Sequence, residues 1–278
     1  MKFSSSSAQV RSSSADQFVR PTRPFARVSV IIPTLNEAAN LPHVFPRLPY
    51  DELFEVIIVD GHSTDDTIAV ARLLYPGIRV VLQDGVGKGD ALACGFCAAR
   101  GDIIVMLDAD GSTDPAEIPD FLDRLFDGAD FAKGSRFATG GGSVDITPVR
   151  RVGNCFLNGV VNWLYGTSYT DLCYGYNAFW FDVLPKINVN CAGFEVETLM
   201  NVRVAKAGLV VSEVPSVEQK RIFGVSKLRP VRDGLRVLRT ILAERFDGRP
   251  VTNCPKPKFR EMERAAQDSR PLSAELST

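Results

Sequence analysis

The sequence predicts an α/β protein whose single, mostly parallel sheet is flanked by helices. Apolar, β-branched runs at 28–32, 54–59 and 103–107 alternate with segments of helical character. Runs that are apolar at every position indicate strands buried on both faces, as in a parallel sheet covered by helices. Short connections between alternating strands and helices favour right-handed crossovers and a Rossmann-like arrangement.

The N-terminal half is regular. We expect strands at 28–32, 54–59, 78–82 and 103–107, with a helix after each of the first three. Pro33 ends the first strand, and a helix from Asn36 to Leu48 follows. Ser63 or Thr64 caps the second helix, and the glycine-rich segment 85–89 leads into the third.

The C-terminal half is less regular. We expect a strand at 130–136, a helix at 150–165, a strand at 210–214 and a helix at 229–246. In the last helix, apolar side chains recur at helical spacing and arginines fill another face. The apolar residues are Val231, Leu235, Leu238 and Leu242, and the arginines are Arg232, Arg236 and Arg239.

Composition and charge narrow the class of protein. The chain has 278 residues, of which 45% are hydrophobic and 23% charged, as in ordinary globular proteins. A net charge of −1 argues against nucleic-acid binding, which needs a basic domain. No run reaches the ~18 apolar residues that a membrane span requires, and the Ser-rich N-terminus lacks the apolar core of a secretory signal.

One folded domain is expected at 27–246, between disordered tails at 1–26 and 247–278. The first tail is rich in serine, and the second has prolines scattered among charges, which is typical of disorder. The six cysteines fall mostly in apolar or helical segments, and we interpret them as buried free thiols. Free thiols fit a reducing compartment, here the cytoplasm.

Two carboxylates end the most informative strand. Residues 103–107 run directly into Asp108, Ala109 and Asp110, and open α/β sheets bind their ligands at the carboxyl ends of strands. Two unpaired carboxylates repel each other, and Mg²⁺ is typically held by one or two carboxylates plus phosphate oxygens. The pair therefore indicates metal-bridged binding of a nucleotide diphosphate. The alternative is that both acids cap the turn at 111–113.

Five short motifs follow one another over residues 28–245. They are VIIPTLNE at 30–37, VDGHSTD at 59–65, DAD at 108–110, GSR at 134–136 and RIFGVSKL at 221–228. Together they resemble family-two glycosyltransferases of the A-type fold, close to dolichol-phosphate mannose synthases and bacterial polyprenyl-phosphate glycosyltransferases. The resemblance implies inverting transfer from a nucleotide-diphosphate sugar of the GDP-mannose or UDP-glucose type. It implies Mg²⁺ or Mn²⁺ held by Asp108 and Asp110, with Ala109 beside the donor.

On the donor side, the resemblance assigns Pro33, Leu35 and Glu37 to the loop that receives the nucleotide base and ribose. It assigns Asp60 to a hydrogen bond with the nucleotide, and the alternative for Asp60 is a helix-capping turn. Lys88 lies in a segment that is similar to the family's glycine loop, where it would offset phosphate charge. Otherwise Lys88 is a solvated side chain beside a turn.

Three positions depart from the family pattern. Relatives often have Tyr at the position of Leu35, a second Asp at Gly61, and Gln or His at Ser112. The first departure implies weaker stacking on the nucleotide base. The second leaves the identity of the nucleotide undecided, and the third implies that water takes a position where relatives often have a metal ligand.

On the acceptor side, Arg136 matches a basic residue near the donor or acceptor phosphate. Asp171 lies in a segment that is similar to the family's acceptor-side segment. Glu195 and Glu197 follow, and both acids lie on one face if this piece is extended. The alternatives are an Arg136 paired with a neighbouring carboxylate, and glutamates buried in pairs with arginine.

Arg221 and Lys227 flank Gly224, whose freedom lets the loop close. Two cations match a diphosphate and an acceptor phosphate. The alternative is a surface loop with solvated charges.

Three functions are consistent with these residues. In the first, the acceptor is a polyprenyl or dolichyl phosphate, which is already an anionic nucleophile, while the metal and basic residues stabilise the leaving diphosphate. In the second, a peripheral enzyme acts on a polysaccharide or small hydroxyl acceptor and needs a base, for which Glu195 and Asp171 are the candidates. The third is a non-catalytic sugar-nucleotide-binding protein, against which the intact Asp108 and Asp110 pair argues.

The basic helix at 229–246 predicts contact with a membrane surface. Its arginines would face lipid headgroups while its apolar stripe inserts in part. Alternatively the stripe packs against the rest of the domain, or a membrane-protein partner supplies the anchor. The expected location is the cytoplasm or the cytoplasmic face of the membrane.

Overall fold

A computed structural model of the chain describes residues 19–224 and 229–246. Its centre is a seven-stranded sheet in the order β3-β2-β1-β4-β7-β5-β8. The strands are β1 (Val28–Thr34), β2 (Glu55–Asp60), β3 (Arg79–Leu82), β4 (Ile103–Met106), β5 (Phe131–Ser135), β7 (Asn177–Trp180) and β8 (Val211–Pro215). The pairs that β7 makes with β4 and β5 are antiparallel, and the other pairs of this sheet are parallel. The predicted mostly parallel sheet is confirmed.

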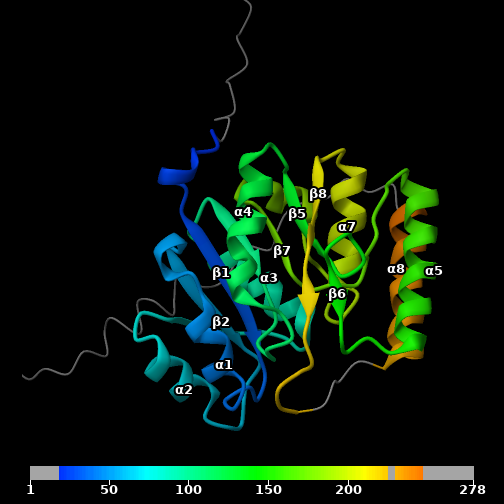
Figure 1. Ribbon diagram of the computed structural model, residues 1–278. Coiled ribbons are helices and arrows are strands. Elements are labelled where there is room, and N and C mark those ends of the chain that lie inside the picture. Colours follow the sequence, from blue (N-terminus) through cyan, green and yellow to red (C-terminus); the bar gives the residue numbers. More distant parts are fainter. Residues whose placement is uncertain (1–18, 225–228, 247–278) are drawn as a thin grey trace, which may run out of the picture.

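Helices flank this sheet, and a small parallel pair of strands, β6 (Gly142–Ser143) and β9 (Val217–Glu218), lies beside it (Figure 1). The α-helices are α1 (Leu41–Val44), α2 (Thr67–Leu74), α3 (Lys88–Ala98), α4 (Ile118–Phe126), α5 (Pro148–Tyr165), α6 (Leu184–Ile187), α7 (Val196–Lys206) and α8 (Pro230–Phe246). Short 3-10 turns occur at Arg23–Phe25, Phe45–Arg47, Tyr50–Glu52, Pro115–Glu117 and Phe181–Val183.

The hydrophobic core has two parts. The larger part surrounds the sheet, where α3 packs on β1 to β3 and α4 packs on β5, β7 and β8. The smaller part joins α5, α7 and α8 through Leu157, Val161, Tyr169, Leu172, Val202, Val237 and Ile241. Figure 1 shows α5 and α8 side by side at the edge of the molecule. No helix in the described residues is long and apolar enough to span a membrane.

The folded domain begins earlier than we expected. Residues 19–26, assigned to a disordered tail, are tied to the domain by arginines. Arg20 lies 2.7 Å from Asp130 and 3.1 Å from Asp182, and its guanidinium stacks over the Trp180 ring. Such pairs hold a segment that buries little apolar surface of its own. Residues 1–18 and the predicted C-terminal tail lie outside the described residues.

The helix expected from Asn36 to Leu48 is wrong in most of its length. Asn36 has a φ of 60°, and the helix starts at Leu41 and becomes a 3-10 turn at Phe45. Prolines at 42, 46 and 49 explain this, because proline has no N–H to donate and is tolerated only in the first turn of a helix. The strand before it runs past Pro33, which is tolerated because the pairing of β1 with β4 stops at Ile31.

The five cysteines within the described residues are free thiols, as expected. Cys155 and Cys173 are nevertheless exposed rather than buried. Cys155 lies on the outer side of α5, away from the residues of that helix that pack inward.

Candidate active site

The carboxyl ends of β1, β2 and β4 meet at one edge of the sheet, and the candidate residues gather there. Asp108 and Asp110 follow β4 closely, as the sequence predicted. The Ser112 N–H donates to Asp110 at 2.9 Å, whereas the Asp108 side chain is 30% exposed. Both acids line two cavities that meet at this point. They are therefore accessible to ligands in addition to shaping the turn.

Lys88 is the centre of a cluster of charges at this junction. Its ammonium lies 2.5 Å from Asp108 Oδ1 and 2.7 Å from Glu197 Oε1. Burial alone would lower the pKa of Lys88, but the two carboxylates outweigh burial and raise it. Burial raises the pKa of Glu197, and Lys88 offsets part of that shift. Lys88 is thus not the solvated side chain of the alternative interpretation.

Glycines allow this cluster to form. A Cβ atom at Gly175 would stand 2.7 Å from Lys88 Nζ and 3.0 Å from Asp108 Oδ2, so any side chain there would displace them. Gly87, with a φ of 95°, packs against the Ala192 carbonyl. The Gly89 N–H donates to the same carbonyl at 3.0 Å. The start of α3 is therefore fixed to the segment that leads into α7, which brings Lys88 to Glu197.

The acids at 195 and 197 do not share a face, because this piece is not extended. Helix α7 begins at Val196 and turns them apart. Glu197 points to Lys88, and Glu195 Oε2 lies 3.6 Å from Arg236. The same Glu195 oxygen makes no hydrogen bond within the described residues. Pairing with arginine, which we had kept as the alternative, describes Glu195, whereas the partner of Glu197 is Lys88.

Arg221 joins the site from the segment after β9. Its guanidinium lies 2.6 Å from Asp110 Oδ2 and 3.7 Å from Glu37 Oε1. Glu37 also accepts a hydrogen bond from Asn40 Nδ2, and burial raises the pKa of Glu37. Arg221 is thus placed beside a proposed metal ligand rather than free in solvent. Lys227, its predicted companion, lies outside the described residues.

Arg136 is buried between two carboxylates. It donates to Asp171 from Nε at 2.6 Å and from Nη2 at 2.9 Å, and to both oxygens of Glu218 at 3.1 Å. Burial would raise the pKa of Asp171, but Arg136 lowers it below its usual value. Asn154 donates to the same Asp171 carboxylate at 3.1 Å. This is the structural pairing that we had kept as the alternative for Arg136, and it leaves Asp171 ionised and fully bonded.

The first of the two cavities, the strand-end cavity, has a volume of about 830 Å³ and lies against β1 and α3. Pro33, Leu35, Glu37, Lys88, Ala109 and Glu195 line it, as do Gly61, Gln83, Arg229, Arg232 and Arg236. Arg232 and Arg236 of α8, and Arg229 just before this helix, therefore face this cavity rather than a separate outer surface. Its walls combine an apolar end at Pro33 and Leu35 with cations near Asp108.

Asp60 lies next to this cavity but is occupied by its own turn. Its carboxylate accepts the Ser63 N–H at 2.9 Å and the Ser63 hydroxyl at 2.6 Å, which is the capping arrangement that we had kept as the alternative. Gln83 was not among the predicted site residues. A Cβ atom at Gly61 would stand 2.9 Å from Gln83 Oε1, so the Gln83 side chain lies directly beside Gly61. Its position just after β3, beside β2, was the available signal.

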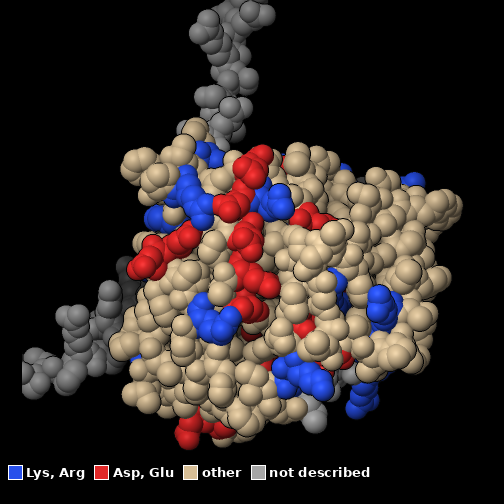
Figure 2. Space-filling view, viewed as in Figure 1, with Lys and Arg blue, Asp and Glu red and all other residues tan. Residues whose placement is uncertain are grey.

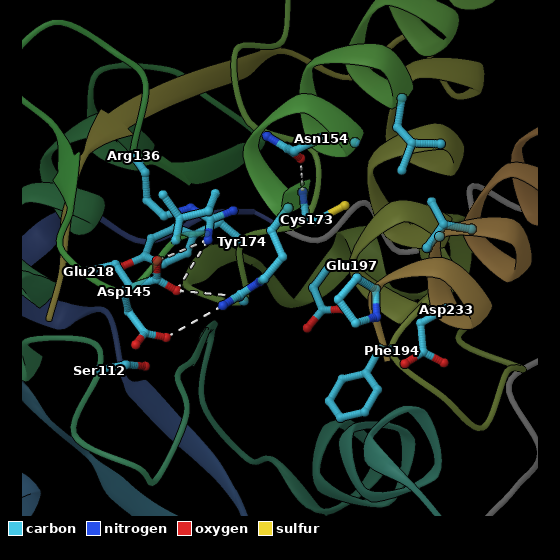
Figure 3. A pocket seen from close by; sticks show the side chains of 18 of the residues that line it. Ser112, Arg136, Asp145, Asn154, Cys173, Tyr174, Phe194, Glu197, Glu218 and Asp233 are labelled. Atoms are coloured by element: carbon cyan, nitrogen blue, oxygen red, sulfur yellow. Dashed lines mark hydrogen bonds and ion pairs between the residues drawn. The ribbon is translucent and has the colours of Figure 1, made fainter. Parts of the chain in front are cut away.

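The second cavity, the interhelical cavity, lies between the first turns of α5 and α8 and has a volume of about 360 Å³. Figure 3 shows Arg136, Glu218 and Asp145 on one side and Phe194, Glu197 and Asp233 on the other. Apolar side chains complete the wall, namely Ile146, Val149, Leu157, Val231 and Val237. Lys88, Asp108, Asp110 and Arg221 line both cavities, so one set of charges lies where the two cavities meet.

Fold and site together define a class. A mostly parallel sheet that presents two carboxylates to a cation-rich cavity at its strand ends is the arrangement of nucleotide-sugar transferases with an A-type fold. The chain belongs to Glycosyl transferase family 2, whose family model matches residues 29–188. It is therefore a glycosyltransferase, an enzyme that uses a nucleotide-sugar donor.

Named relatives support this membership. The chain is 36% identical over 223 residues to a polyprenol monophosphomannose synthase of Mycolicibacterium smegmatis, covering 76% of this chain and 83% of the relative. It is 32% identical over 209 residues to the glycosyltransferase AglJ of Haloferax volcanii, covering 74% and 68%. A crystal structure of glucosyl-3-phosphoglycerate synthase from Mycobacterium tuberculosis, in complex with Mn²⁺, UDP-glucose and phosphoglyceric acid, is similar with a TM-score of 0.63. That structure is 26% identical, covering 80% of this chain and 81% of the other.

Proposed function

We propose that the enzyme transfers a sugar from a nucleoside diphosphate to a polyprenyl phosphate, with inversion at the anomeric carbon. The observation that supports it most is the pair of cavities that meet at Lys88 and Asp108. The strand-end cavity offers cations for a diphosphate. The interhelical cavity combines apolar side chains such as Val149, Val231 and Val237 with charged ones, which suits an acceptor that has an isoprenoid chain and a phosphate head.

The relatives agree with this assignment. One is named a polyprenol monophosphomannose synthase, and a structural neighbour was solved with UDP-glucose. These names support a donor of the GDP-mannose or UDP-glucose type. The nucleotide base would lie at the apolar end of the strand-end cavity, near Pro33 and Leu35, with Gln83 within reach of its edge.

A divalent cation fits the acids that are present. Among the described residues no group of three or more His, Cys, Asp or Glu side chains is arranged to hold a metal. Asp108 and Asp110 are thus the pair available, and two carboxylates plus ligand oxygens are the usual partners of Mg²⁺ and serve Mn²⁺ equally. When bound, the metal would neutralise charge on the diphosphate. The complex with Mn²⁺ in the neighbouring structure supports the same view.

The residues of the chain would bind and orient the two substrates. Arg221 would exchange its contact with Asp110 for one with the diphosphate of the donor. Arg232 and Arg236 would bind the nucleotide part of the donor in the strand-end cavity. Lys88 would stay between the cavities and meet both phosphate groups. An oxygen of the acceptor phosphate would attack the anomeric carbon. The bond from that carbon to the diphosphate oxygen would break, and the diphosphate would leave with the electron pair.

No proton has to move in this reaction, because the acceptor phosphate is already an anion. A hydroxyl acceptor would need a base, and the candidates from the sequence are badly placed for it. Asp171 is held by Arg136 and Asn154, and Glu195 lines the strand-end cavity rather than the interhelical one. Neither candidate is therefore positioned to act as the base for a hydroxyl acceptor in the interhelical cavity.

A transfer assay tests this proposal. The purified enzyme with Mn²⁺ is given radiolabelled GDP-mannose or UDP-glucose, and polyprenyl phosphate, an unphosphorylated polyprenol or an oligosaccharide as acceptor. We expect a labelled lipid product with polyprenyl phosphate and none with polyprenol. Transfer to the oligosaccharide at a higher rate than to polyprenyl phosphate would contradict the proposal.

A further inference from the structure

The outer side of α5 and α8 carries an unusual number of large apolar side chains without partners. Each is at least 41% exposed, and Trp163 is 83% exposed. They are Val149, Val152, Phe156 and Trp163 on α5, and Val231, Leu235, Leu242 and Phe246 on α8. We call this set the two-helix face. Exposed apolar patches of this extent on a soluble domain mark interaction sites.

The two stripes lie on neighbouring helices. On α5, Leu157 and Val161 pack inward, and on α8, Val237 and Ile241 do so. The exposed residues follow at spacings of three, four or seven on the opposite sides of these helices. Helices α5 and α8 lie side by side at the edge of the molecule (Figure 1), and each packs on the domain with the side opposite to its exposed stripe. Part of the two-helix face is a shallow hollow lined by Val152, Cys155, Phe156, Gly159, Val160 and Trp163.

This face is continuous with the interhelical cavity. Val149 and Val231 belong to the face and also line the cavity. The mouth of the proposed acceptor site therefore opens at one end of an exposed apolar surface.

Charge and residue type fit a lipid bilayer. Figure 2 shows few charges over most of α5 and basic side chains near its lower end. Arg239 on α8 is exposed and lies four residues after Leu235 and three before Leu242, which suits anionic headgroups. Trp163 combines an apolar ring with one polar N–H, as do the residues enriched at membrane–water interfaces.

We propose that the two-helix face docks on the surface of an anionic lipid bilayer and presents the interhelical cavity to lipids in that bilayer. This inference rests on the proposed function, because it gives the polyprenyl phosphate acceptor its route to the site. It differs from the expectation for 229–246 alone. Helix α5 contributes half of the surface, and Arg232 and Arg236 of α8 face the strand-end cavity instead.

A vesicle co-sedimentation experiment tests the docking. The full chain is mixed at low salt with vesicles of phosphatidylcholine and phosphatidylglycerol. The variant is Phe156→Ser with Trp163→Ser, whose side chains line neither catalytic cavity. The matched control is Leu73→Ser on α2, which is 81% exposed and lies off the face. We expect at least ~10-fold weaker partitioning into vesicles for the double variant, because it lacks two aromatic rings that would become buried in the bilayer. We expect no change for the control.

Two acceptors separate docking from chemistry. With long-chain polyprenyl phosphate in the vesicles, the double variant should lose activity in step with its binding. With a short, water-soluble isoprenyl phosphate, it should keep the activity of the unchanged enzyme. If the unchanged enzyme uses neither acceptor, the proposed function fails, while the sedimentation result still decides on docking.

Three results would overturn the inference. The double variant could sediment with vesicles as the unchanged protein does. The control could lose binding to the same extent. The unchanged protein could also be a dimer by analytical ultracentrifugation that the double variant converts to monomers, with no vesicle binding in either form. That last result would assign the face to a second copy of the chain.

Discussion

Replacement of Lys88 by methionine tests the charge cluster on which the site depends. Methionine keeps the length of the side chain and removes the ammonium, which leaves Asp108 and Glu197 without their shared partner. Removing one member of a buried ion pair costs about 3–5 kcal/mol. Glu197 can respond by binding a proton, so we expect the lower end, about 3 kcal/mol. A loss of that size lowers the melting temperature by roughly 6–12 °C in a domain of this length.

The pH dependence of this loss has a definite sign. Burial raises the pKa of Glu197 in the folded state, and without Lys88 nothing in the cluster offsets that. A group with a raised folded pKa contributes its full stability below its unfolded pKa, about 4.3. That contribution is lost as the pH rises through the folded pKa. The deficit of Lys88→Met should therefore be smallest in acid and grow toward neutral pH.

Thermal melting of matched variants over a pH series is the assay. Lys88→Met with Glu197→Gln removes the unpaired charge and should recover much of the lost stability at neutral pH. Lys186→Met changes an exposed lysine and should melt like the unchanged protein. If the double variant is no more stable than Lys88→Met, or if the deficit does not change with pH, the cluster does not act as we describe.

Three further predictions concern the reaction itself. Asp108→Asn should abolish transfer with an unchanged circular dichroism spectrum, and EDTA should do so reversibly; full activity in EDTA would contradict a metal at this pair. Arg221→Ala should lower turnover at least ~10²-fold, the scale of losing a preorganised charge, with little change in melting because its partly exposed pair with Asp110 is worth at most ~1 kcal/mol. Normal turnover with a large loss of stability would mean that Arg221 is structural. Arg232→Ala should raise the KM for the donor while Arg239→Ala, which does not line the strand-end cavity, should not; equal effects would show that the arginines act through net charge.

The sequence predicted what depends on local pattern. The apolar run at 103–107 ending in Asp108 gave both a buried strand and the acidic edge, because a strand and the residue after it are neighbours in sequence and in space. The helix expected at 36–48 is mostly absent, because prolines at 42, 46 and 49 cannot donate the hydrogen bonds of a helix interior. From its sequence the segment 194–197 could be extended or helical, and the apolar pattern of so short a piece does not distinguish the two conformations.

The sequence alone does not identify the partners of the charged residues. Lys88 meets Glu197, and Arg136 meets Asp171 and Glu218, through contacts that join distant parts of the chain. A motif such as GSR at 134–136 shows that an arginine is present and not whether it faces a ligand or a carboxylate. The burial that decides between these roles comes from the packing of several elements at once.

The antiparallel strand β7 has a consequence for how the protein is made. It lies between β4 and β5 in the sheet but leaves the ribosome after both of them and after α5. Until residues 177–180 appear, β4 and β5 each have an unpaired edge, and such edges favour association with other chains. The same insertion brings Gly175 to Lys88 and Asp108. A nascent chain that ends before β7 is therefore exposed to aggregation and lacks part of the catalytic centre. The sheet is completed only when β8 pairs with β5, after Glu197 of α7 has also been added.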